Sequence, residues 1–567
     1  MSAIKLDTFE PSLHSPKAGP SEPPSRTSFG TLPLDNVNDE ASLRPVPTCI
    51  ESLRHIAPEG EQAPYHVFTS TMKNWIVFNV SAVAALSGLS SNIYFPAQEN
   101  ISVGLSLPME VVNLSITTYM IAQGLAPSFW APLADRQGRR TTLMYTLLLY
   151  VGANVALALT TNSAMLLVFR ALQAAGSSST IALGAGVIAD IAAPHERGGY
   201  LGWFSGVRQL SLALGPVIGG LLAGSVRWRS IFWFLTAFSS LCVVGVLLLI
   251  PETLRRIAGN GEVPLEHWYY RPLLWSFLQN SRTPNRNLED QTAPRTVSAE
   301  IKPAKPFSFK IFIRPFKLLC EWDALCALLF GGCVYTAWSM MVASTTYLLK
   351  DIYQFSTIQI GLCFLANGFG CIIGSISAGR YLNYDYRREA QLWQFARHIH
   401  PDTPLPSKVI PTSFPLEKAR LGKGYVYTTV TIWSLLLFGW SLTAPGPSND
   451  PKSHWIVPLL AQFAAGWGAT SVLTSNNTLL VDSFPDDSAS ASAILNLSRC
   501  LMAAGGVAGV DPFLRACGPG WLSVLLVGIV VVGVVPYGLH SFYGQRWRED
   551  RATRNGCADP CTPGPRA

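Results

Sequence analysis

Twelve long apolar stretches constrain the fold of this chain more than any other feature of its sequence. The first six cover roughly 74–97, 109–131, 141–161, 165–187, 200–224 and 229–250, and the second six cover roughly 319–345, 357–379, 424–444, 454–477, 489–510 and 519–538. An apolar stretch of about 20 residues with few charges can cross a bilayer as a helix. The sequence therefore predicts an all-α membrane protein whose twelve transmembrane helices form two pseudo-symmetric bundles of six.

The polar segments divide the chain into five predicted parts. These are a disordered N-terminal tail (1–72), an N-terminal six-helix bundle (73–250), a central loop (251–318), a C-terminal six-helix bundle (319–540) and a C-terminal tail (541–567). The tail at 1–72 is rich in Pro, Ser, Glu and Asp and has few aromatic residues, which is typical of disorder. Only 14% of all residues are charged, against about 25% in soluble domains.

Most of the eleven cysteines lie inside the apolar stretches, and they lack the spacing of metal ligands. We also find no nucleotide-binding loop and no nucleophile motif. We therefore expect no enzymatic activity, no cofactor, no metal and no nucleic-acid partner. The expected partners are the lipid bilayer and a small-molecule substrate, and we expect a monomer.

The distribution of Lys and Arg predicts the orientation in the membrane. With both termini in the cytosol, the inner loops would be 132–140, 188–199, 251–318, 380–423 and 478–488. These loops hold 23 Lys and Arg residues, whereas the outer loops hold five, Arg227, Arg229, Lys350, Lys452 and Arg515. Because positive residues are enriched in cytosolic loops, we expect both termini in the cytosol. Asn100, in an Asn-Ile-Ser triplet, is then a candidate for glycosylation on the outside.

The loop between the second and third stretches carries a charged motif. It reads APLADRQGRR, from Ala131 to Arg140. It resembles the Gly-x-x-x-Asp-Arg-x-Gly-Arg-Arg motif of the major facilitator superfamily, with Ala131 in place of the first glycine. Gly138 permits a tight turn, and a carboxylate such as Asp135 is favoured at the N-terminus of a neighbouring helix. In the family this motif acts as a conformational latch, which implies a gating role for Asp135, Arg136, Gly138, Arg139 and Arg140.

Two further stretches resemble the same superfamily. The fourth contains FRALQAAGSSS, in which Arg170 and Gln173 share one face of a helix. The fifth reads LGWFSGVRQLSLALGPVIGG and resembles the antiporter motif of exporting members. Pro216 should kink this helix, and its glycines let a neighbouring helix approach closely. The resemblance assigns a gating role to Gly215, Pro216, Gly219 and Gly220.

Several other strings narrow the resemblance. They are SSNIYFPA, PETLRRIAGNG, VYTAWSMMVASTTYL, NGFGCIIGS, FPLEKARL, LLVDSFP and NLSRCLMAAGG. Together they resemble the fungal branch of the twelve-span drug:proton antiporters, and within it citrate exporters and secondary-metabolite efflux pumps. The resemblance implies the fold of that superfamily, transport by alternating access and a place in the plasma membrane.

Two arginines are predicted to lie deep in the membrane. Arg208 and Arg499 each follow the inner start of a stretch by about ten residues, which places them roughly 15 Å deep. We find no Asp or Glu at a similar depth. Ionisable groups at this depth normally face a cavity or a partner, and guanidinium groups pair well with carboxylates. The predicted substrate-binding residues are Arg208, Arg499, Arg170, Gln173, Gln209, Asn496, Tyr94 and Tyr335, with Asn92, Tyr119, Gln123, Trp338 and Asn367 as further candidates.

These residues favour a transporter that exports a small organic anion, such as a citrate-like carboxylate or an acidic metabolite. A broad drug or toxin:proton antiporter is the alternative, so coupling to protons stays open. A solute-sensing receptor with a transporter fold is a more distant alternative. A buried arginine can also serve structure alone by bonding to helix carbonyl groups.

Overall fold

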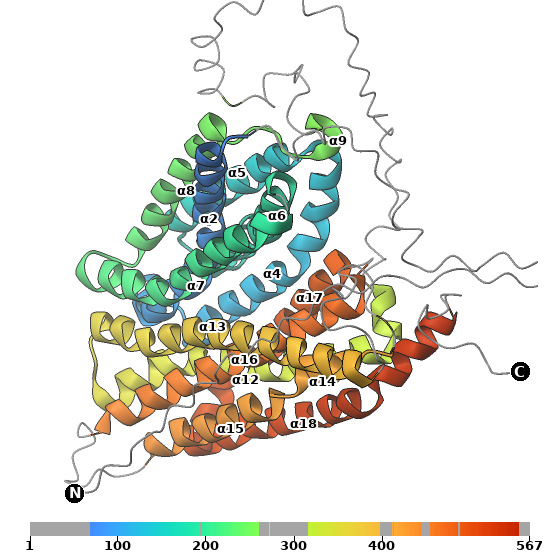
Figure 1. Cartoon of the computed structure of the whole chain (residues 1–567). Coiled ribbons are helices and arrows are strands. Elements are labelled where there is room, and N and C mark those ends of the chain that lie inside the picture. The colour runs from blue at the N-terminus through green and yellow to red at the C-terminus, as the bar shows by residue number, and fades with distance from the viewer. Residues whose placement is uncertain are drawn as a thin grey trace, which may run out of the picture. The chain divides into compact units, whose positions relative to one another are not determined.

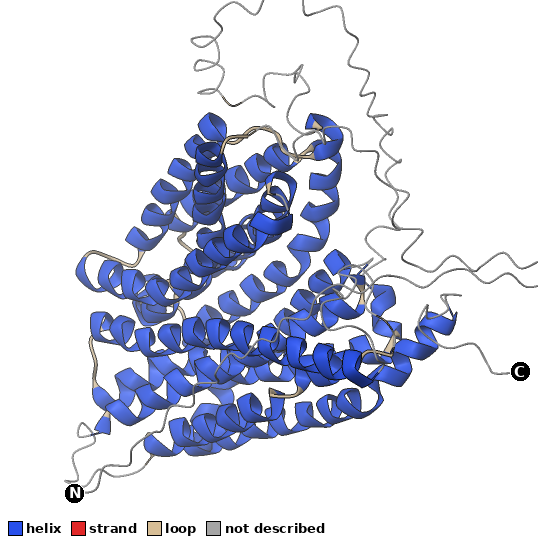
Figure 2. Ribbon diagram, viewed as in Figure 1, coloured by secondary structure: helices blue, strands red, loops and turns tan. Residues whose placement is uncertain are grey.

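The structure is a computed structural model. It describes residues 68–192, 194–259, 272, 316–396, 411, 413–443, 454–485 and 488–554. The regular secondary structure of these residues is helical (Figure 2). Most of the predicted N-terminal tail and central loop, and the chain after residue 554, lie outside the described residues.

The described residues contain twelve helices of 18 residues or more. In the first half they are α2 (Ser70–Asn92), α4 (Met109–Gln137), α5 (Arg139–Ala158), α6 (Ser163–Ile191), α7 (Pro194–Ser225) and α8 (Arg229–Leu249). In the second half they are α12 (Trp322–Tyr353), α13 (Thr357–Ala396), α15 (Gly424–Ser441), α16 (Ile456–Ser483), α17 (Ser488–Ala508) and α18 (Val510–Arg554). The short helices are η1 (Phe95–Ala97), α3 (Gln98–Leu105), α9 (Arg255–Ala258), η4 (Leu318–Cys320) and α14 (Leu416–Leu421).

Each long helix overlaps one predicted span. Ten of the described helices are long and apolar enough to cross a membrane. The other two, α4 and α15, are more polar, because α4 carries Asn, Gln and Thr side chains and α15 has only 18 residues, three of them Thr. α4 packs on α6 of its own half and on α17 of the other half, and α15 packs on α16 and α18. These neighbours cover part of the polar surface of both helices.

Two helices extend well beyond the predicted spans. α13 has 40 residues and ends at Ala396, and α18 has 45 residues and ends at Arg554. The boundary expected at 540 therefore falls inside α18. This extension is held by tertiary contacts rather than by an apolar sequence: Arg548 forms an ion pair with Glu417 at 3.1 Å and donates to the carbonyl oxygen of Phe414 at 2.6 Å.

The two halves repeat the same packing pattern. In the first half α2 packs on α7, α4 on α6, and α5 on α6 and α8; in the second half α12 packs on α17, α13 on α16, and α15 on α16 and α18. The contacts between the halves follow the same repeat: α7 lies against α13, and α17 lies against α4 (Figure 1). This arrangement places α7 and α17 in corresponding positions, as the sequence predicts for the helices that carry Arg208 and Arg499.

The names inner end and outer end follow the predicted orientation: the inner end carries the α4–α5 connection, and the outer end carries α3. Among the described residues, three pairs of side chains join the halves at the outer end, and we call them the outer cross-links. They are the ion pairs Glu99–Lys350 and Glu110–Arg515 and the hydrogen bond from Asn113 to Asp511. The ring of Phe95 also stacks on that of Phe364, with centroids 6.1 Å apart.

At the inner end, several ion pairs join residues of the same half. They include Lys73–Glu196 and Arg139–Asp190 in the first half, and Arg420–Asp482, Arg548–Glu417 and Arg551–Asp323 in the second. These ion pairs therefore stay within one half at the inner end, whereas the outer cross-links join the two halves.

Candidate functional site

Arg208 and Arg499 come together from opposite halves of the molecule. Arg208 lies in α7 and Arg499 in α17, and each guanidinium group is within electrostatic range of the other. The ring of Tyr335, from α12, lies 5.3 Å from the guanidinium carbon of Arg499. Both arginines are only partly buried, and among the described residues neither forms an ion pair. We call Arg208, Tyr335 and Arg499 the arginine pair site.

The surroundings of Arg499 leave part of its guanidinium group unused. Its Nη2 donates to Oδ1 of Asn496 at 2.8 Å, while its buried Nε has no partner in the described structure. Asn496 in turn donates to the carbonyl oxygen of Gln123 in α4 at 3.1 Å. The arginine pair site is therefore fixed to both halves, and Arg499 retains an N–H group that can donate a hydrogen bond to an added anion.

Arg170 lies in a separate, sealed cluster of the first half. Its side chain is 1% exposed and lies between the rings of Tyr94 and Tyr119, at 4.2 and 4.4 Å from their centroids. Its Nη1 donates to Oε1 of Gln173 at 2.6 Å, and Gln173 donates to Asn154 at 2.7 Å. The structure thus brings together the predicted residues Arg170, Gln173 and Tyr94, but buries them away from solvent. Tyr119 is also within electrostatic range of Tyr335, so it connects this cluster to the arginine pair site.

The other predicted binding residues already have partners inside the protein. Gln209 joins the halves, because its amide donates to the hydroxyl of Ser375 in α13 at 2.7 Å. Trp338 donates to Asn367 at 3.0 Å. Asn92 donates to the carbonyl oxygen of Gly88 in its own helix at 3.1 Å. These contacts satisfy polar groups of the three side chains within the protein.

The motif between α4 and α5 forms a compact network around Glu252, a residue that the sequence reasoning missed. Glu252 is 1% exposed, and its carboxylate accepts hydrogen bonds from four backbone N–H groups: Arg139 at 2.8 Å, Arg140 at 3.2 Å, and Thr253 and Leu254 at 3.0 Å. Burial raises the pKa of the Glu252 carboxyl, and these four donors oppose that rise. The carboxylate therefore caps the N-terminus of α5, where the helix dipole favours negative charge.

Asp135 does not make the predicted contact with a helix N-terminus, whereas its gating role stays a prediction. The carboxylate at the helix N-terminus is that of Glu252, whereas Asp135 pairs with Arg139 at 2.8 Å and its side chain is 62% exposed. Arg139 also pairs with Asp190 at 3.3 Å, and the side chain of Arg140 donates to the carbonyl oxygen of Leu247 at 2.8 Å. The carbonyl oxygen of Arg136 accepts a hydrogen bond from Arg256 at 2.9 Å. The motif thus ties α4, α5, α6 and the segment after α8 together.

Gly138 makes room for this cap. Its φ is +107°, and a Cβ atom there would lie 2.2 Å from Oε2 of Glu252. A side chain at this position would collide with the carboxylate and strain the backbone. The sequence motif therefore needs glycine at this position for two independent reasons.

The glycines of α7 allow close helix contacts, as the sequence predicts. A Cβ at Gly219 would lie 2.1 Å from the carbonyl oxygen of Ile93, and one at Gly220 would lie 2.7 Å from that of Thr357. At Gly215 the nearest atom would be Cβ of Asn92, at 3.1 Å. Pro216 lies inside the helix between them. This face of α7 therefore contacts the end of the first span and also α13 of the other half.

Asn100, the glycosylation candidate, lies in α3 at the outer end. Its Nδ2 donates to the carbonyl oxygen of Ala223 at 3.0 Å, and its side chain is partly buried. A glycan on this nitrogen would have to displace that contact.

Comparisons with known proteins fit this architecture. The family model of the Major Facilitator Superfamily matches residues 80–395. Citrate exporter 1 of Aspergillus niger is 40% identical over 522 residues, which cover 92% of this chain and 94% of the exporter. Quinidine resistance protein 1 of Saccharomyces cerevisiae is 32% identical over 457 residues, covering 78% of each chain.

Among solved structures, a partially occluded inward open conformation of the xylose transporter XylE from E. coli matches with a TM-score of 0.54. It is 13% identical, and the match covers 83% of this chain and 97% of XylE. This likeness concerns the fold. The sequence matches, the twelve long helices and the repeated packing of the two halves lead to one assignment: the chain belongs to the Major Facilitator Superfamily and is a membrane transporter.

Proposed function

We propose that this transporter exports a small organic anion, such as a citrate-like di- or tricarboxylate or an acidic metabolite, from the cytosol by alternating access. The observation that carries the proposal is the arginine pair site, in which Arg208 and Arg499, from opposite halves, lie within electrostatic range of each other. Two like charges inside a membrane protein are costly unless a counter-ion joins them. Among the described residues no carboxylate fills that role, so an anionic substrate is the missing partner.

The geometry of guanidinium groups supports a carboxylate in particular. Arginine presents parallel N–H donors that match the two oxygens of a carboxylate, and the unpaired Nε of Arg499 is one such donor. A substrate with two carboxylates could contact both halves at once, one through Arg208 and one through Arg499. Such a ligand would bind across the boundary that moves during alternating access.

On this proposal the protein lies in the plasma membrane with both termini in the cytosol, where the membrane potential favours export of an anion. An inside-negative potential expels anions with about 2.3 kcal/mol per charge per 100 mV. A monomer suffices for this mechanism, and it needs no obligatory proton. The positions of the acidic residues in the described helices support transport without an obligatory proton. These residues lie near helix ends, as Asp190, Asp323, Asp482 and Asp511 do, or in the inner extension of α13.

The likeness to Citrate exporter 1 supports the same substrate class. The likeness to Quinidine resistance protein 1 favours the second candidate function, a drug:proton antiporter. A pocket for cationic drugs would favour buried carboxylates over paired arginines. We therefore rank anion export first.

The decisive experiment measures citrate efflux from secretion-deficient yeast that expresses the wild type, Arg208→Ala, Arg208→Lys or Arg554→Ala. Loss of one charge-assisted contact predicts that Arg208→Ala lowers efflux at least about tenfold, and Arg208→Lys should retain only part of the activity. Arg554→Ala is the control, because this side chain is 62% exposed and pairs with Glu321 at 2.7 Å on the surface. All variants are compared at equal amounts in the membrane.

Metabolite profiling of the medium extends the test to other anions. The proposal fails if the wild type exports no organic anion, or if the Arg208→Ala variant exports every organic anion that the wild type does. It also fails if the wild type exports a cationic drug, an uncoupler of the proton gradient abolishes that export, and Arg208→Ala leaves it intact.

A further inference from the structure

Asn496 lies one helical turn before Arg499 in α17 and uses both ends of its amide inside the protein. Its Oδ1 accepts a hydrogen bond from Nη2 of Arg499 at 2.8 Å. Its Nδ2 donates to the carbonyl oxygen of Gln123, in α4 of the other half, at 3.1 Å. An amide supplies both the acceptor and the donor that these contacts need, whereas a carboxylate supplies acceptors alone. The side chain therefore connects Arg499 to the opposite half.

The helices α4 and α17 approach each other closely at this contact. A Cβ atom at Gly124, the residue after Gln123, would lie 3.0 Å from Cβ of Cys500 and 3.3 Å from Cδ1 of Leu497. Small residues allow such close packing of membrane helices. The packing holds the carbonyl oxygen of Gln123 opposite Asn496, so the direction of the amide is fixed from the other half.

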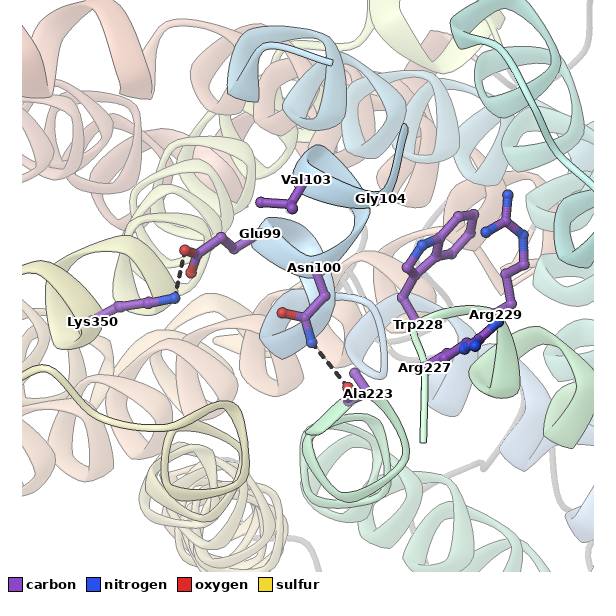
Figure 3. A pocket seen from close by; sticks show the side chains of 9 residues that line it. All are labelled: Glu99, Asn100, Val103, Gly104, Ala223, Arg227, Trp228, Arg229 and Lys350. Carbon is purple, nitrogen blue, oxygen red and sulfur yellow. Dashed lines mark hydrogen bonds and ion pairs between the residues drawn. The ribbon is translucent and has the colours of Figure 1, made fainter. Parts of the chain in front are cut away.

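The amide holds Arg499 without neutralising its charge. The outer cross-links show the other arrangement, because Lys350 pairs there with the carboxylate of Glu99 (Figure 3). Arg515 likewise pairs with Glu110. Side chains three residues apart on a helix are neighbours, so an acid in place of the asparagine would cancel the charge of Arg499. With asparagine there, the arginine pair site keeps both of its positive charges.

We propose that Asn496 is a positioning residue that sets the charge of the accepted substrate, because it orients Arg499 and leaves the arginine pair site doubly positive. Each guanidinium group favours one carboxylate. A ligand with a single charge leaves one arginine uncompensated, which is costly inside a membrane protein. The site therefore selects anions with at least two charges. This inference rests on the proposed function, since it concerns the anion that the arginine pair site binds.

The charge selection is tested by thermal unfolding of the full chain in phosphatidylcholine nanodiscs at constant ionic strength. The probes are succinate and its monoamide succinamate, which have similar size but carry two charges and one charge at about pH 7.5. The wild type should be half-saturated at a lower concentration of succinate than of succinamate.

Asn496→Asp should raise the half-saturating concentration of succinate at least about tenfold, because the new carboxylate replaces one charge-assisted contact of the ligand. It should change that of succinamate much less, because Arg208 remains available. Asn496→Ala should weaken both anions alike, because Arg499 loses its orientation and keeps its charge. The ratio of the two concentrations therefore distinguishes charge selection from a merely structural role.

Asn162→Asp is the matched control. Asn162 is the N-cap of α6, where its Oδ1 accepts a hydrogen bond from the backbone N–H of Met165 at 2.9 Å, and aspartate caps a helix about as well as asparagine. This variant should leave both concentrations unchanged. The proposal is overturned if Asn496→Asp leaves the ratio as it is in the wild type, or if Asn162→Asp changes the ratio equally.

A second measurement needs no ligand. Without any anion, Asn496→Asp should unfold at a higher temperature than Asn496→Ala, because its carboxylate pairs with Arg499. The difference should be much smaller in the Arg499→Ala background, which completes a double-mutant cycle for this contact. An equal difference in both backgrounds would show that the side chain does not act through Arg499.

Failure of the proposed function has a different signature. Neither citrate nor succinate would then change the unfolding temperature of the wild type, and the charge selection would fail with it. The ligand-free cycle would still decide whether Asn496 positions Arg499.

Discussion

Glu252 offers the sharpest test of the inner network. We predict that Glu252→Ala destabilises the protein much more than Asp135→Ala, although the sequence motif contains Asp135 and not Glu252. Glu252 is 1% exposed and accepts four backbone hydrogen bonds between 2.8 and 3.2 Å. Asp135 has a 62% exposed side chain and one ion pair with Arg139, at 2.8 Å.

The magnitudes follow from these contacts. Removing one partner of a buried, hydrogen-bonded charge typically costs about 3–5 kcal/mol, because the donors left behind are unsatisfied. The four hydrogen bonds are not additive, and removing the carboxylate also removes its desolvation cost, so we expect the same range for Glu252→Ala. An exposed ion pair contributes about 1 kcal/mol or less, which sets the expected cost of Asp135→Ala.

The assay is thermal unfolding of the purified variants in one detergent at one scan rate. A common scan rate is needed because membrane proteins of this size commonly unfold irreversibly. Glu252→Gln keeps the size of the side chain and one acceptor oxygen, so it should fall between the wild type and Glu252→Ala. If Asp135→Ala lowers the unfolding temperature as much as Glu252→Ala does, the cap on α5 does not have the role that we assign to it.

Two further predictions concern Glu252 and the glycines of α7. Burial raises the pKa of Glu252 above its ordinary value of 4.5, so folding favours the protonated side chain. The part of the stability that comes from this raised pKa is complete below pH 4.5 and is lost as the pH rises through the folded-state pKa, and it is separate from the contribution of the four hydrogen bonds. The stability difference between the wild type and Glu252→Gln should therefore shrink over that range, and a difference that grows with pH would contradict the assignment. Gly220→Ala should destabilise by about 1–3 kcal/mol, because its Cβ would lie 2.7 Å from the carbonyl oxygen of Thr357 and 3.0 Å from Cα of Gly361. Gly202→Ala in the same helix has nothing within 4 Å and should be neutral or stabilising in the same thermal assay.

The sequence predicts the twelve helices well because lipid exposure leaves a continuous apolar signal. The expected span 229–250 corresponds to α8, which ends at Leu249, and the expected span 357–379 begins at the same residue as α13. Helix ends outside the lipid carry no such signal. The inner extension of α18 depends on Arg548 and its partner Glu417, which lies 131 residues earlier in the chain.

The candidate site likewise contains residues that the sequence predicts and residues that it does not predict. Depth along the helices and the absence of nearby acids single out Arg208 and Arg499, and the structure places them within electrostatic range of each other. Glu252 is missed because its donors Arg139 and Arg140 are more than 110 residues away in the chain. The only local signal was a carboxylate directly after an apolar span, in the string PETLRR. The enclosure of Arg170 by Tyr94 and Tyr119 likewise depends on three different segments of the first half.

The contrast between Arg170 and the arginine pair site bears on how substrate could drive the conformational change. Arg170 is sealed between two tyrosine rings within one half, so its interactions do not depend on how the halves are placed. Arg208 and Arg499 belong to different halves and repel each other. A ligand changes a conformational equilibrium only through interactions that differ between the conformations. On the proposed function, a dicarboxylate that contacts both arginines replaces their mutual repulsion with attraction. The bound substrate therefore favours conformations in which both halves contact it.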